Sequence, residues 1–255
     1  MDPAPGPPPR QTKNKISIIV PAFNEERLIA ATLQSIHTAT DSFSRRAWQT
    51  ELIVCDNNSA DRTCELARAA GARVVFEPVN QISRARNRGA AAATGDWLVF
   101  VDADSQPSPA LFEDVAVQME TGQCLAGGST IELEVGQHPF ITGVTRLWNM
   151  LSRIRHLLAG SFIFCETAAF QQVGGFNQEL FAGEELDLSK RLKQLARKSG
   201  RRIVILHRHP LRTSARKAHL YTRGEFCRFV FRTVLSRGRT LHSRDACHPW
   251  YDGRR

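Results

Sequence analysis

The stretch Trp97-Leu98-Val99-Phe100-Val101-Asp102-Ala103-Asp104 decides the fold of this chain. Its first five residues are all apolar and rich in β-branched and aromatic types, which is typical of a strand buried on both faces. Gly95-Asp96 marks the start of the run, and Pro107 ends it. Because open α/β sheets bind ligands at the carboxyl ends of their parallel strands, we expect the two carboxylates at that edge.

Asp102 and Asp104 are oxygen donors separated by one residue. Two such carboxylates at a strand end can hold a hard divalent cation, and that cation can carry the phosphates of a nucleotide. An isolated Asp-x-Asp is more often a solvated acidic turn, because short motifs recur by chance. The strand in front of the motif and the order of the other elements favour the functional interpretation.

The first hundred residues alternate between strands and helices. Asn24 is predicted as the N-cap of the first helix, with Glu25 and Glu26 in its first turn. Strands are predicted over 16–20, 51–55, 73–76 and 97–101, and the later helices over 62–70 and 83–94. This alternation predicts an α/β fold with a mostly parallel sheet, helices on both faces and a Rossmann-like N-terminal half.

The pattern changes after Asp104. Ser108 and Pro109 are the expected N-cap and first residue of a helix that runs to about Glu120. Strands are predicted at 129–134, 162–164 and 203–207, and helices at 140–159 and 184–199. We therefore divide the chain into a Pro-rich tail (1–14), one domain (15–210, with halves 15–107 and 108–210) and an extension (211–255).

Composition narrows the class of protein. The 255 residues are 42% hydrophobic, which suits one large α/β domain with a small appendage. The sequence contains no run of about 18 apolar residues, so a membrane-spanning helix is not predicted. Residues 1–9 (MDPAPGPPP) lack the apolar core of a signal peptide. The six cysteines are scattered without a Cys-x-x-Cys pair, which favours reduced thiols in a cytosolic protein.

The net charge of +9 is concentrated in the extension. Residues 211–255 contain 11 Lys/Arg and 3 Asp/Glu, so the rest of the chain is nearly neutral. A basic extension can contact an anionic membrane surface or a polyphosphate. A solvated helix face with no partner fits the same residues equally well.

At this point five ordered blocks resemble family 2 glycosyltransferases of the GT-A fold. The blocks are 18–26 (IIVPAFNEE), 54–61 (VCDNNSAD), 85–89 (ARNRG), 102–104 (DAD), and 173–176 (VGGF) followed by 183–188 (GEELDL). Residues 213–217 (TSARK) resemble a loop of some bacterial members. One block is weak support, but the ordered set is specific. The resemblance implies the GT-A (nucleotide-diphospho-sugar transferase) fold.

The resemblance also implies a donor site for a nucleotide sugar. Pro21, Asn24 and Glu25 would lie at the nucleotide, with Glu25 reaching the ribose and Asp56 bonding a uracil or another base. Asp104 would coordinate Mg²⁺ or Mn²⁺, while Asp102 would contact the ribose or a water on the metal. Arg84 and Arg86 are candidates for the base or the phosphates, with a plain surface arginine as the alternative.

The candidate catalytic base lies in 183–187. Most relatives have Glu-Asp where this chain has Glu184-Glu185, so Glu185 aligns with the family's catalytic Asp and is one methylene longer. Glu184 and Asp187 are the next candidates. Three acids that only decorate a helix N-terminus are the alternative.

We therefore expect a metal-dependent glycosyltransferase that moves a sugar from a UDP-sugar to a saccharide, lipid-linked or small-molecule acceptor, by an inverting displacement. The resemblance suggests a role in cell envelope polysaccharide synthesis and a cytoplasmic protein, with membrane contact through its basic extension. One alternative is a catalytically silent binding or scaffold protein. A sugar-nucleotide pyrophosphorylase is less favoured, because residues 21–25 lack a Gly-rich phosphate loop. Nucleic acid is not expected as a partner.

Overall fold

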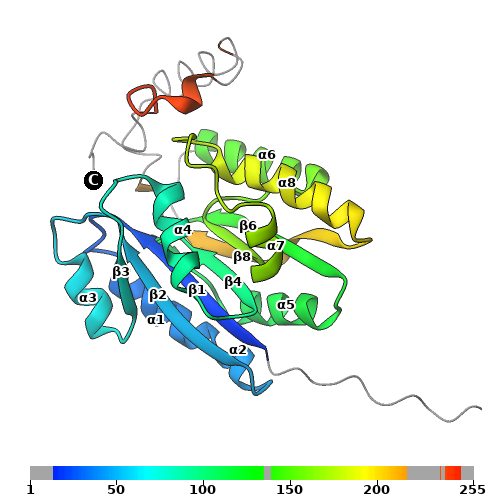
Figure 1. The fold of residues 1–255 in the computed structure, drawn as a ribbon, viewed down its shortest axis with the longest axis horizontal. Coiled ribbons are helices and arrows are strands. Elements are labelled where there is room, and N and C mark those ends of the chain that lie inside the picture. The colour runs from blue at the N-terminus through cyan, green and yellow to red at the C-terminus, as the bar shows by residue number, and fades with distance from the viewer. Residues whose placement is uncertain (1–13, 135–138, 217–235, 237–238, 248–255) are drawn as a thin grey trace, which may run out of the picture.

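The computed structural model describes residues 14–134, 139–216, 236 and 239–247. These residues form one curved eight-stranded sheet with helices on both faces (Figure 1). The strand order is β3 (Arg73–Phe76), β2 (Gln49–Asp56), β1 (Lys15–Ala22), β4 (Trp97–Val101), β7 (Phe162–Glu166), β6 (Cys124–Leu133), β8 (Arg202–Thr213) and β5 (Ser105–Gln106).

The first half of the sheet is parallel. β1 pairs in parallel with β2 and with β4, and β2 pairs in parallel with β3. In the second half β7 is antiparallel to both β4 and β6, β8 is parallel to β6, and β5 is antiparallel to β8. The predicted α/β fold, with a mostly parallel sheet and a Rossmann-like N-terminal half, is confirmed.

Two apolar cores lie on opposite faces of the sheet. Successive residues of β4 point alternately to the two faces, so Val99 joins one core and Phe100 the other. The first core is covered by α1 (Ile29–Ala39), α2 (Asp41–Ser44), α3 (Thr63–Ala69) and α5 (Pro109–Glu120). The second is covered by α4 (Ile82–Ala92), α7 (Thr167–Gln172) and α8 (Glu184–Lys198). All five residues of β4 are buried, as predicted.

The longest helix in the described part of the chain, α6 (Pro139–Arg155), lies against β6 through polar groups. The Asn149 side chain accepts from the Ile131 backbone N–H at 3.0 Å and donates to the Ile131 carbonyl at 2.8 Å. This amide bonds both backbone groups of Ile131, and it fixes how α6 is rotated. Several large apolar side chains of α6 are consequently exposed.

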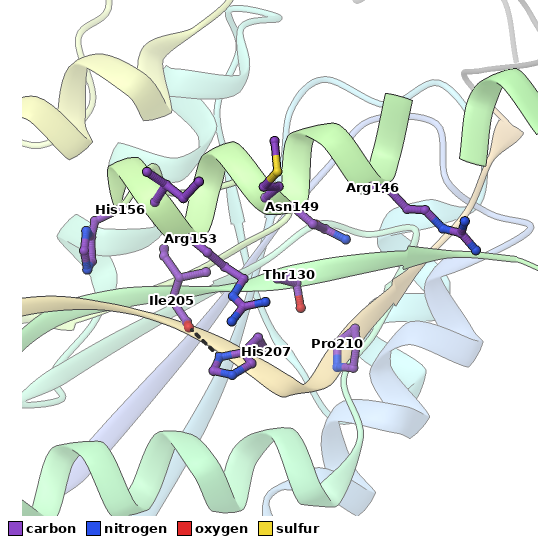
Figure 2. Close-up of a pocket in the computed structure, with 10 residues that line it drawn as sticks. Thr130, Arg146, Asn149, Arg153, His156, Ile205, His207 and Pro210 are labelled. Atoms are coloured by element: carbon purple, nitrogen blue, oxygen red, sulfur yellow. Dashed lines mark hydrogen bonds between the residues drawn. The ribbon is translucent and has the colours of Figure 1, made fainter. Parts of the chain in front are cut away.

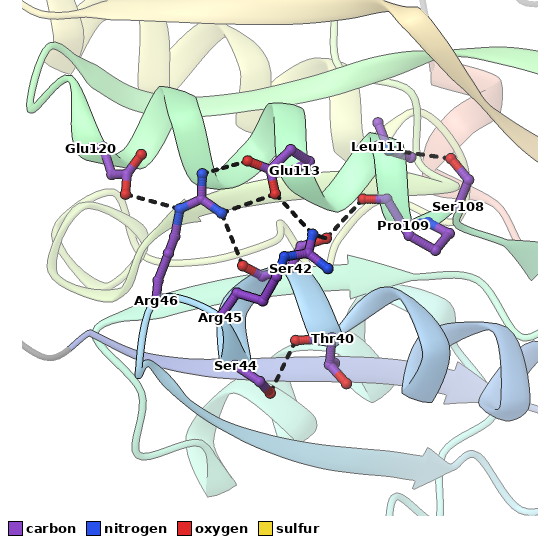
Figure 3. A network of polar contacts seen from close by, with 10 residues as sticks. All are labelled: Thr40, Ser42, Ser44, Arg45, Arg46, Ser108, Pro109, Leu111, Glu113 and Glu120. Carbon is purple, nitrogen blue, oxygen red and sulfur yellow. Dashed lines mark hydrogen bonds and ion pairs between the residues drawn. The ribbon is translucent and has the colours of Figure 1, made fainter.

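A polar network anchors α5, the helix that follows the Asp-x-Asp motif (Figure 3). Arg46 donates two hydrogen bonds to Glu113, of 2.9 and 2.5 Å, and one to Glu120 of 2.8 Å. The Ser42 hydroxyl donates to the carbonyl of Pro109 at 2.8 Å. The predicted start of α5 is confirmed, because Ser108 is its N-cap and accepts from the Leu111 N–H at 3.1 Å.

Several sequence-based boundaries are wrong, including the start of β6, which is Cys124 and not 129, and the end of α6, which is Arg155 and not 159. Asn24 does not cap the first helix: α1 begins at Ile29, and Asn24 has a left-handed backbone with φ of 52°. Its side chain instead accepts from the Ala60 N–H at 2.8 Å, so a contact with a distant loop replaces the local cap. In addition, β8 continues to Thr213, so the division drawn after residue 210 falls within a strand.

Some predictions concern residues that the structure does not describe. The Pro-rich residues 1–13 and most of the basic extension, including 217–235, lie outside the described residues. Within the described part, Cys55, Cys124, Cys165 and Cys247 are buried free thiols and Cys64 is a half-buried one. In that same part, no helix has the length and apolar character needed to cross a membrane.

Candidate functional site

The predicted site residues meet at one edge of the sheet. In the pairing of β1 with β2, Pro21 lies beside Cys55 and Ala22 beside Asp56, so the two strands end together. The Asp56 side chain is buried and accepts from the Ser59 N–H at 3.2 Å. The carboxyl end of β4 lies next to that of β1 and leads into Asp102. The topology thus places segments 18–26, 54–61 and 102–104 at the same edge of the sheet.

The loop after β1 is fixed by the loop after β2. The Asn24 N–H donates to the Ser59 hydroxyl at 2.9 Å, and the Glu25 N–H donates to the Thr63 hydroxyl at 2.7 Å. These contacts bury Glu25, which is 5% exposed. Asn24 therefore positions the loop that carries Glu25, which is a structural role that the sequence did not indicate.

Arg216 occupies the place next to Glu25. Its Nη2 lies 2.7 and 2.8 Å from the two carboxylate oxygens of Glu25. The chain reaches this point by crossing the Asp-x-Asp motif, because the Ser214 N–H donates to the carbonyl of Asp104 at 3.0 Å. The sequence analysis noted the TSARK resemblance but did not assign Arg216 to the site. Its partner lies 191 positions earlier in the chain.

The two acids of the Asp-x-Asp motif have different surroundings. Asp102 accepts from Nη2 of Arg86 at 2.8 Å. Asp104 is half-buried and lines a cavity of about 230 Å³, together with Glu132, Glu134 and Thr213. Asp102 is therefore held by Arg86, whereas Asp104 accepts a 3.4 Å hydrogen bond from the Ser105 hydroxyl and lines the cavity.

Arg86 connects the motif to the candidate base helix. It is 1% exposed, and besides Asp102 it donates from Nη1 to Glu184 at 2.7 Å and from Nη2 to the Gly160 carbonyl at 2.7 Å. Its guanidinium also lies 5.2 Å from the centre of the Phe176 ring. Burial on its own would lower the pKa of Arg86, but Asp102 and Glu184 outweigh it and raise that pKa above the ordinary value.

The position of Arg86 does not favour a direct contact with the base or the phosphates. Two carboxylates and a carbonyl already use its terminal nitrogens. Arg84 points elsewhere, because its Nε donates to Glu77 at 3.1 Å and its Nη1 to Gln178 at 3.2 Å. The sequence grouped these two arginines, but the structure separates them.

The three acids at the start of α8 also have different partners. Glu184 is buried against Arg86, and Asp187 pairs with Arg191 at 2.6 Å. Glu185 is half-buried, and its carboxyl forms no ion pair with any of the residues that the structure describes. Burial, followed by the charge of Glu184, raises the pKa of Glu185 to about 8. Glu185 is thus the acid of the three that is available for a proton transfer.

Gly160 shows how tightly this cluster is built. A Cβ at position 160 would lie 3.2 Å from Nη2 of Arg86 and 3.7 Å from Cδ of Glu185. The residue before α8, Gly183, has φ of 74°, a conformation that glycine adopts without steric strain. Gly160 therefore lets the chain approach the cluster closely, and Gly183 permits the turn into α8.

A complete protein cage for a metal is not present among the described residues, where no group of three or more His, Cys, Asp or Glu side chains is arranged to hold an ion. His209 instead has its Nδ1 2.9 Å from Asp114, and His207 is exposed. Mg²⁺ is commonly held by one or two carboxylates together with substrate phosphates and water. The open carboxylate of Asp104 fits that type of site.

The chain resembles known sequences over part of its length. Residues 17–170 match the family model described as Glycosyl transferase family 2. The chain is 34% identical over 113 residues to "Uncharacterized glycosyltransferase EpsJ" of Bacillus subtilis (strain 168), which covers 42% of the chain and 31% of that relative. It is 36% identical over 101 residues to 4,4'-diaponeurosporenoate glycosyltransferase of Staphylococcus haemolyticus, which covers 37% and 25%. Such matches span about a third or less of these relatives' length.

Solved structures resemble the fold over most of the chain. The mannosyltransferase PcManGT of Pyrobaculum calidifontis, in complex with GDP-Man and Mn²⁺, gives a TM-score of 0.64 at 18% identity, covering 93% of this chain and 65% of that one. Glucosyl-3-phosphoglycerate synthase of Mycobacterium tuberculosis, with Mn²⁺, UDP and phosphoglyceric acid, gives 0.60 at 24% identity, covering 89% and 79%. These likenesses show the predicted GT-A fold.

Proposed function

The chain belongs to glycosyltransferase family 2, and on that premise we propose that it transfers a sugar from a UDP-sugar to an acceptor hydroxyl with inversion. One observation carries the proposal. Among the three acids at the start of α8, Glu185 alone forms no ion pair within the described residues, and it lies beside the cluster that joins α8 to the Asp-x-Asp motif.

The donor nucleotide is proposed to bind at the ends of β1, β2 and β4. Asp56 would accept a hydrogen bond from the base, and Glu25 would bond the ribose hydroxyls, with Pro21 and Asn24 shaping the loop. Asp102 would contact the ribose from the other side while Arg86 fixes its orientation. A ribose contact at Glu25 requires Arg216 to share this carboxylate or to leave it.

A divalent cation is proposed to bind at Asp104, next to the donor phosphates. The UDP and GDP-mannose complexes of the two structural neighbours contain Mn²⁺, which supports Mg²⁺ or Mn²⁺ here. When bound, the cation would neutralise charge on the diphosphate leaving group. Asp104 supplies the carboxylate from the protein, and Glu132 and Glu134 add negative charge to the same cavity.

Glu185 is proposed to act as the general base. The acceptor oxygen would form a bond to the anomeric carbon as the bond from that carbon to the diphosphate breaks, and the hydroxyl proton would pass to the Glu185 carboxylate. A single displacement of this kind inverts the configuration. A base with a pKa near the working pH suits proton transfer, and the raised pKa of about 8 lies close to that range.

A catalytically silent binding protein is the second candidate. The ion pair between Arg216 and Glu25 favours it, because it occupies the carboxylate that the ribose would need. The cytoplasmic location, the envelope polysaccharide role and membrane contact through the basic extension stay predictions. Most of that extension lies outside the described residues.

A thermal-shift panel tests the proposed function. UDP, GDP, CDP and TDP and their sugars are each added with Mn²⁺, Mg²⁺ or EDTA to the wild type and to Asp104→Asn. A ligand at about 100 times its Kd stabilises the folded state by about 2.7 kcal/mol. The proposal predicts a metal-dependent shift with the UDP compounds that Asp104→Asn loses. An identical shift in EDTA would show that nucleotide binding does not require a metal. No shift with any nucleotide would favour the catalytically silent binding protein.

A further inference from the structure

A groove of about 770 Å³ lies between α6 and β8 (Figure 2). Its arginine and histidine side chains come from two elements and a loop: Arg146 and Arg153 from α6, His156 from just after α6, and His207 from β8. Among the described residues, no acidic side chain lines the groove. The groove is separate from the carboxylate cluster around Arg86, which has the opposite charge.

The floor of the groove holds a buried hydroxyl without a partner. Thr130 of β6 is 5% exposed, and its Oγ1 makes no hydrogen bond with any residue that the structure describes. Figure 2 shows this hydroxyl pointing into the groove, beside Arg153 and Pro210. A buried polar group without a hydrogen bond costs free energy, so a ligand atom that accepts from Thr130 would remove that cost.

Both arginines belong to α6 and line the groove at different points along the helix (Figure 2). Arg146 and Arg153 are seven residues apart on α6, so they project from one side of the helix two turns apart. The side chain of Asn149, between them, is held by the Ile131 backbone and fixes that side toward β6. His207 faces them from β8, with its Nδ1 3.4 Å from the Ile205 carbonyl.

We propose that this groove binds a phosphate group. Guanidinium groups match the geometry of phosphate oxygens and donate two hydrogen bonds at once, and the histidines add donors when protonated. The Thr130 hydroxyl supplies a further donor at the floor. Phosphate binding in this groove does not depend on the sugar transfer proposed above.

The groove borders an apolar surface on the same helix. The stripe Phe140, Val144, Leu147, Leu151 and Ile154 recurs at intervals of three and four residues, and each member is 39–64% exposed. Ile154 also lines the groove. A phosphate attached to an apolar chain would use both surfaces, whereas a soluble phosphate ester would use the groove alone.

The groove is connected to the candidate base helix by a short segment. Residues 156–160 run from the end of α6 to Gly160, whose carbonyl accepts from Arg86. Within that segment the Leu158 N–H donates to the Ser189 hydroxyl of α8 at 3.0 Å. A ligand that contacts His156 in the groove would touch the segment that also contacts α8, so we extend the proposal to a phosphate-bearing acceptor. This acceptor role, unlike binding itself, rests on the proposed function.

Isothermal titration with glycerol 1-phosphate, against glycerol, tests the binding site. The double variant R146Q/R153Q removes the two guanidinium groups, and Thr130→Val removes the hydroxyl at constant shape. R68Q/R197Q is the matched control, since both arginines are exposed on other helices. We expect the phosphate ester to bind, R146Q/R153Q to weaken it at least about tenfold, and Thr130→Val to weaken it about threefold without loss of Tm. The control should bind like the wild type.

Vesicle flotation distinguishes the two sources of phosphate. Phosphatidylcholine vesicles with and without phosphatidate are compared for the wild type, R146Q/R153Q and L147Q/L151Q. If the wild type floats with the phosphatidate vesicles and both variants do not, the bound group is a lipid phosphate. If the wild type binds glycerol 1-phosphate but does not float with these vesicles, the bound group is a soluble phosphate ester. The proposal is overturned if neither probe binds, or if R146Q/R153Q binds both like the wild type.

UDP with Mn²⁺ is titrated into the same variants to keep the two proposals separate. Unchanged UDP binding in R146Q/R153Q, with loss of glycerol 1-phosphate, supports the phosphate site and leaves the donor site intact. Absence of UDP binding in the wild type would refute the proposed function and would leave the phosphate result standing.

Discussion

Arg86 and Glu184 form a buried ion pair of 2.7 Å that joins α4 to the first residue of α8. The other terminal nitrogen of Arg86 contacts Asp102, so one guanidinium holds both the Asp-x-Asp motif and the helix of the candidate base. Arg86 therefore positions acidic groups of the site.

Removing Arg86 should destabilise the fold. Arg86→Met leaves Glu184 buried without its cation, and breaking a buried pair in this way costs about 3–5 kcal/mol. Urea unfolding measures the loss. Arg84→Met is the control, because Arg84 is partly exposed and its pair with Glu77 should contribute about 1 kcal/mol or less. Adding Glu184→Gln to Arg86→Met should recover part of the loss. Equal effects of Arg86→Met and Arg84→Met would contradict the bridging role.

Glu185→Gln should abolish most of the sugar transfer while leaving the donor affinity unchanged. General-base catalysis contributes about 10²- to 10⁴-fold to a rate, so kcat should fall by that factor. The control is Asp187→Asn, which breaks an ion pair with Arg191 on the same helix. A larger loss of kcat in Asp187→Asn than in Glu185→Gln would move the base to Asp187.

The pH dependence of the activity should follow the pKa of Glu185. Burial and the charge of Glu184 raise this pKa to about 8, and the base must be deprotonated to act. We expect kcat/KM to rise about tenfold per pH unit below pH 8 and to level above it. A plateau that already begins at pH 6 would show that another group is the base.

Folding stability should depend on pH in the opposite sense. Because the pKa of Glu185 is raised in the folded state, the folded protein favours the protonated carboxyl more than the unfolded chain does. This contribution to stability is fully present below the ordinary pKa of 4.5 and is lost as the pH rises through about 8. Urea unfolding at pH 5 and pH 9 should show a smaller pH effect in Glu185→Gln than in the wild type. An equal effect in both would contradict the raised pKa.

Arg216→Gln should raise the affinity for uridine by about threefold. The guanidinium competes with ribose hydroxyls for the Glu25 carboxylate, and a net gain of about 0.6 kcal/mol on its removal corresponds to about threefold in affinity. Isothermal titration measures the affinity for uridine. Arg27→Gln is the control, because Arg27 and Arg216 line one cavity. Weaker uridine binding in Arg216→Gln would instead show that Arg216 contacts the nucleoside.

Elements with strong local signals could be predicted from the sequence. The all-apolar run of β4 and the Ser108-Pro109 start of α5 were both correct, because burial on two faces and helix capping depend on neighbouring residues. The start of α1 was wrong because Asn24 bonds Ala60 instead of its own helix. The end of β8 was missed because pairing with β6 extends that strand beyond its apolar run.

The partners within the site could not be predicted in the same way. Glu184 lies 98 positions from Arg86, and Glu25 lies 191 positions from Arg216. The sequence could place all four residues in recognisable segments, but the pairing depends on how the second half of the sheet folds back over the first. The distinct environment of Glu185 follows from the first of these pairs, because Arg86 forms an ion pair with the neighbouring Glu184.

The most direct test of UDP-sugar transfer by this chain measures the release of UDP from a UDP-sugar. The assay contains Mn²⁺, with water or a phosphate-bearing alcohol as the acceptor. The account predicts release by the wild type, loss in EDTA and in Asp104→Asn, and a fall of about 10²-fold or more in Glu185→Gln. Release at the same rate in Glu185→Gln and the wild type, or tight UDP binding without turnover of any UDP-sugar, would contradict it.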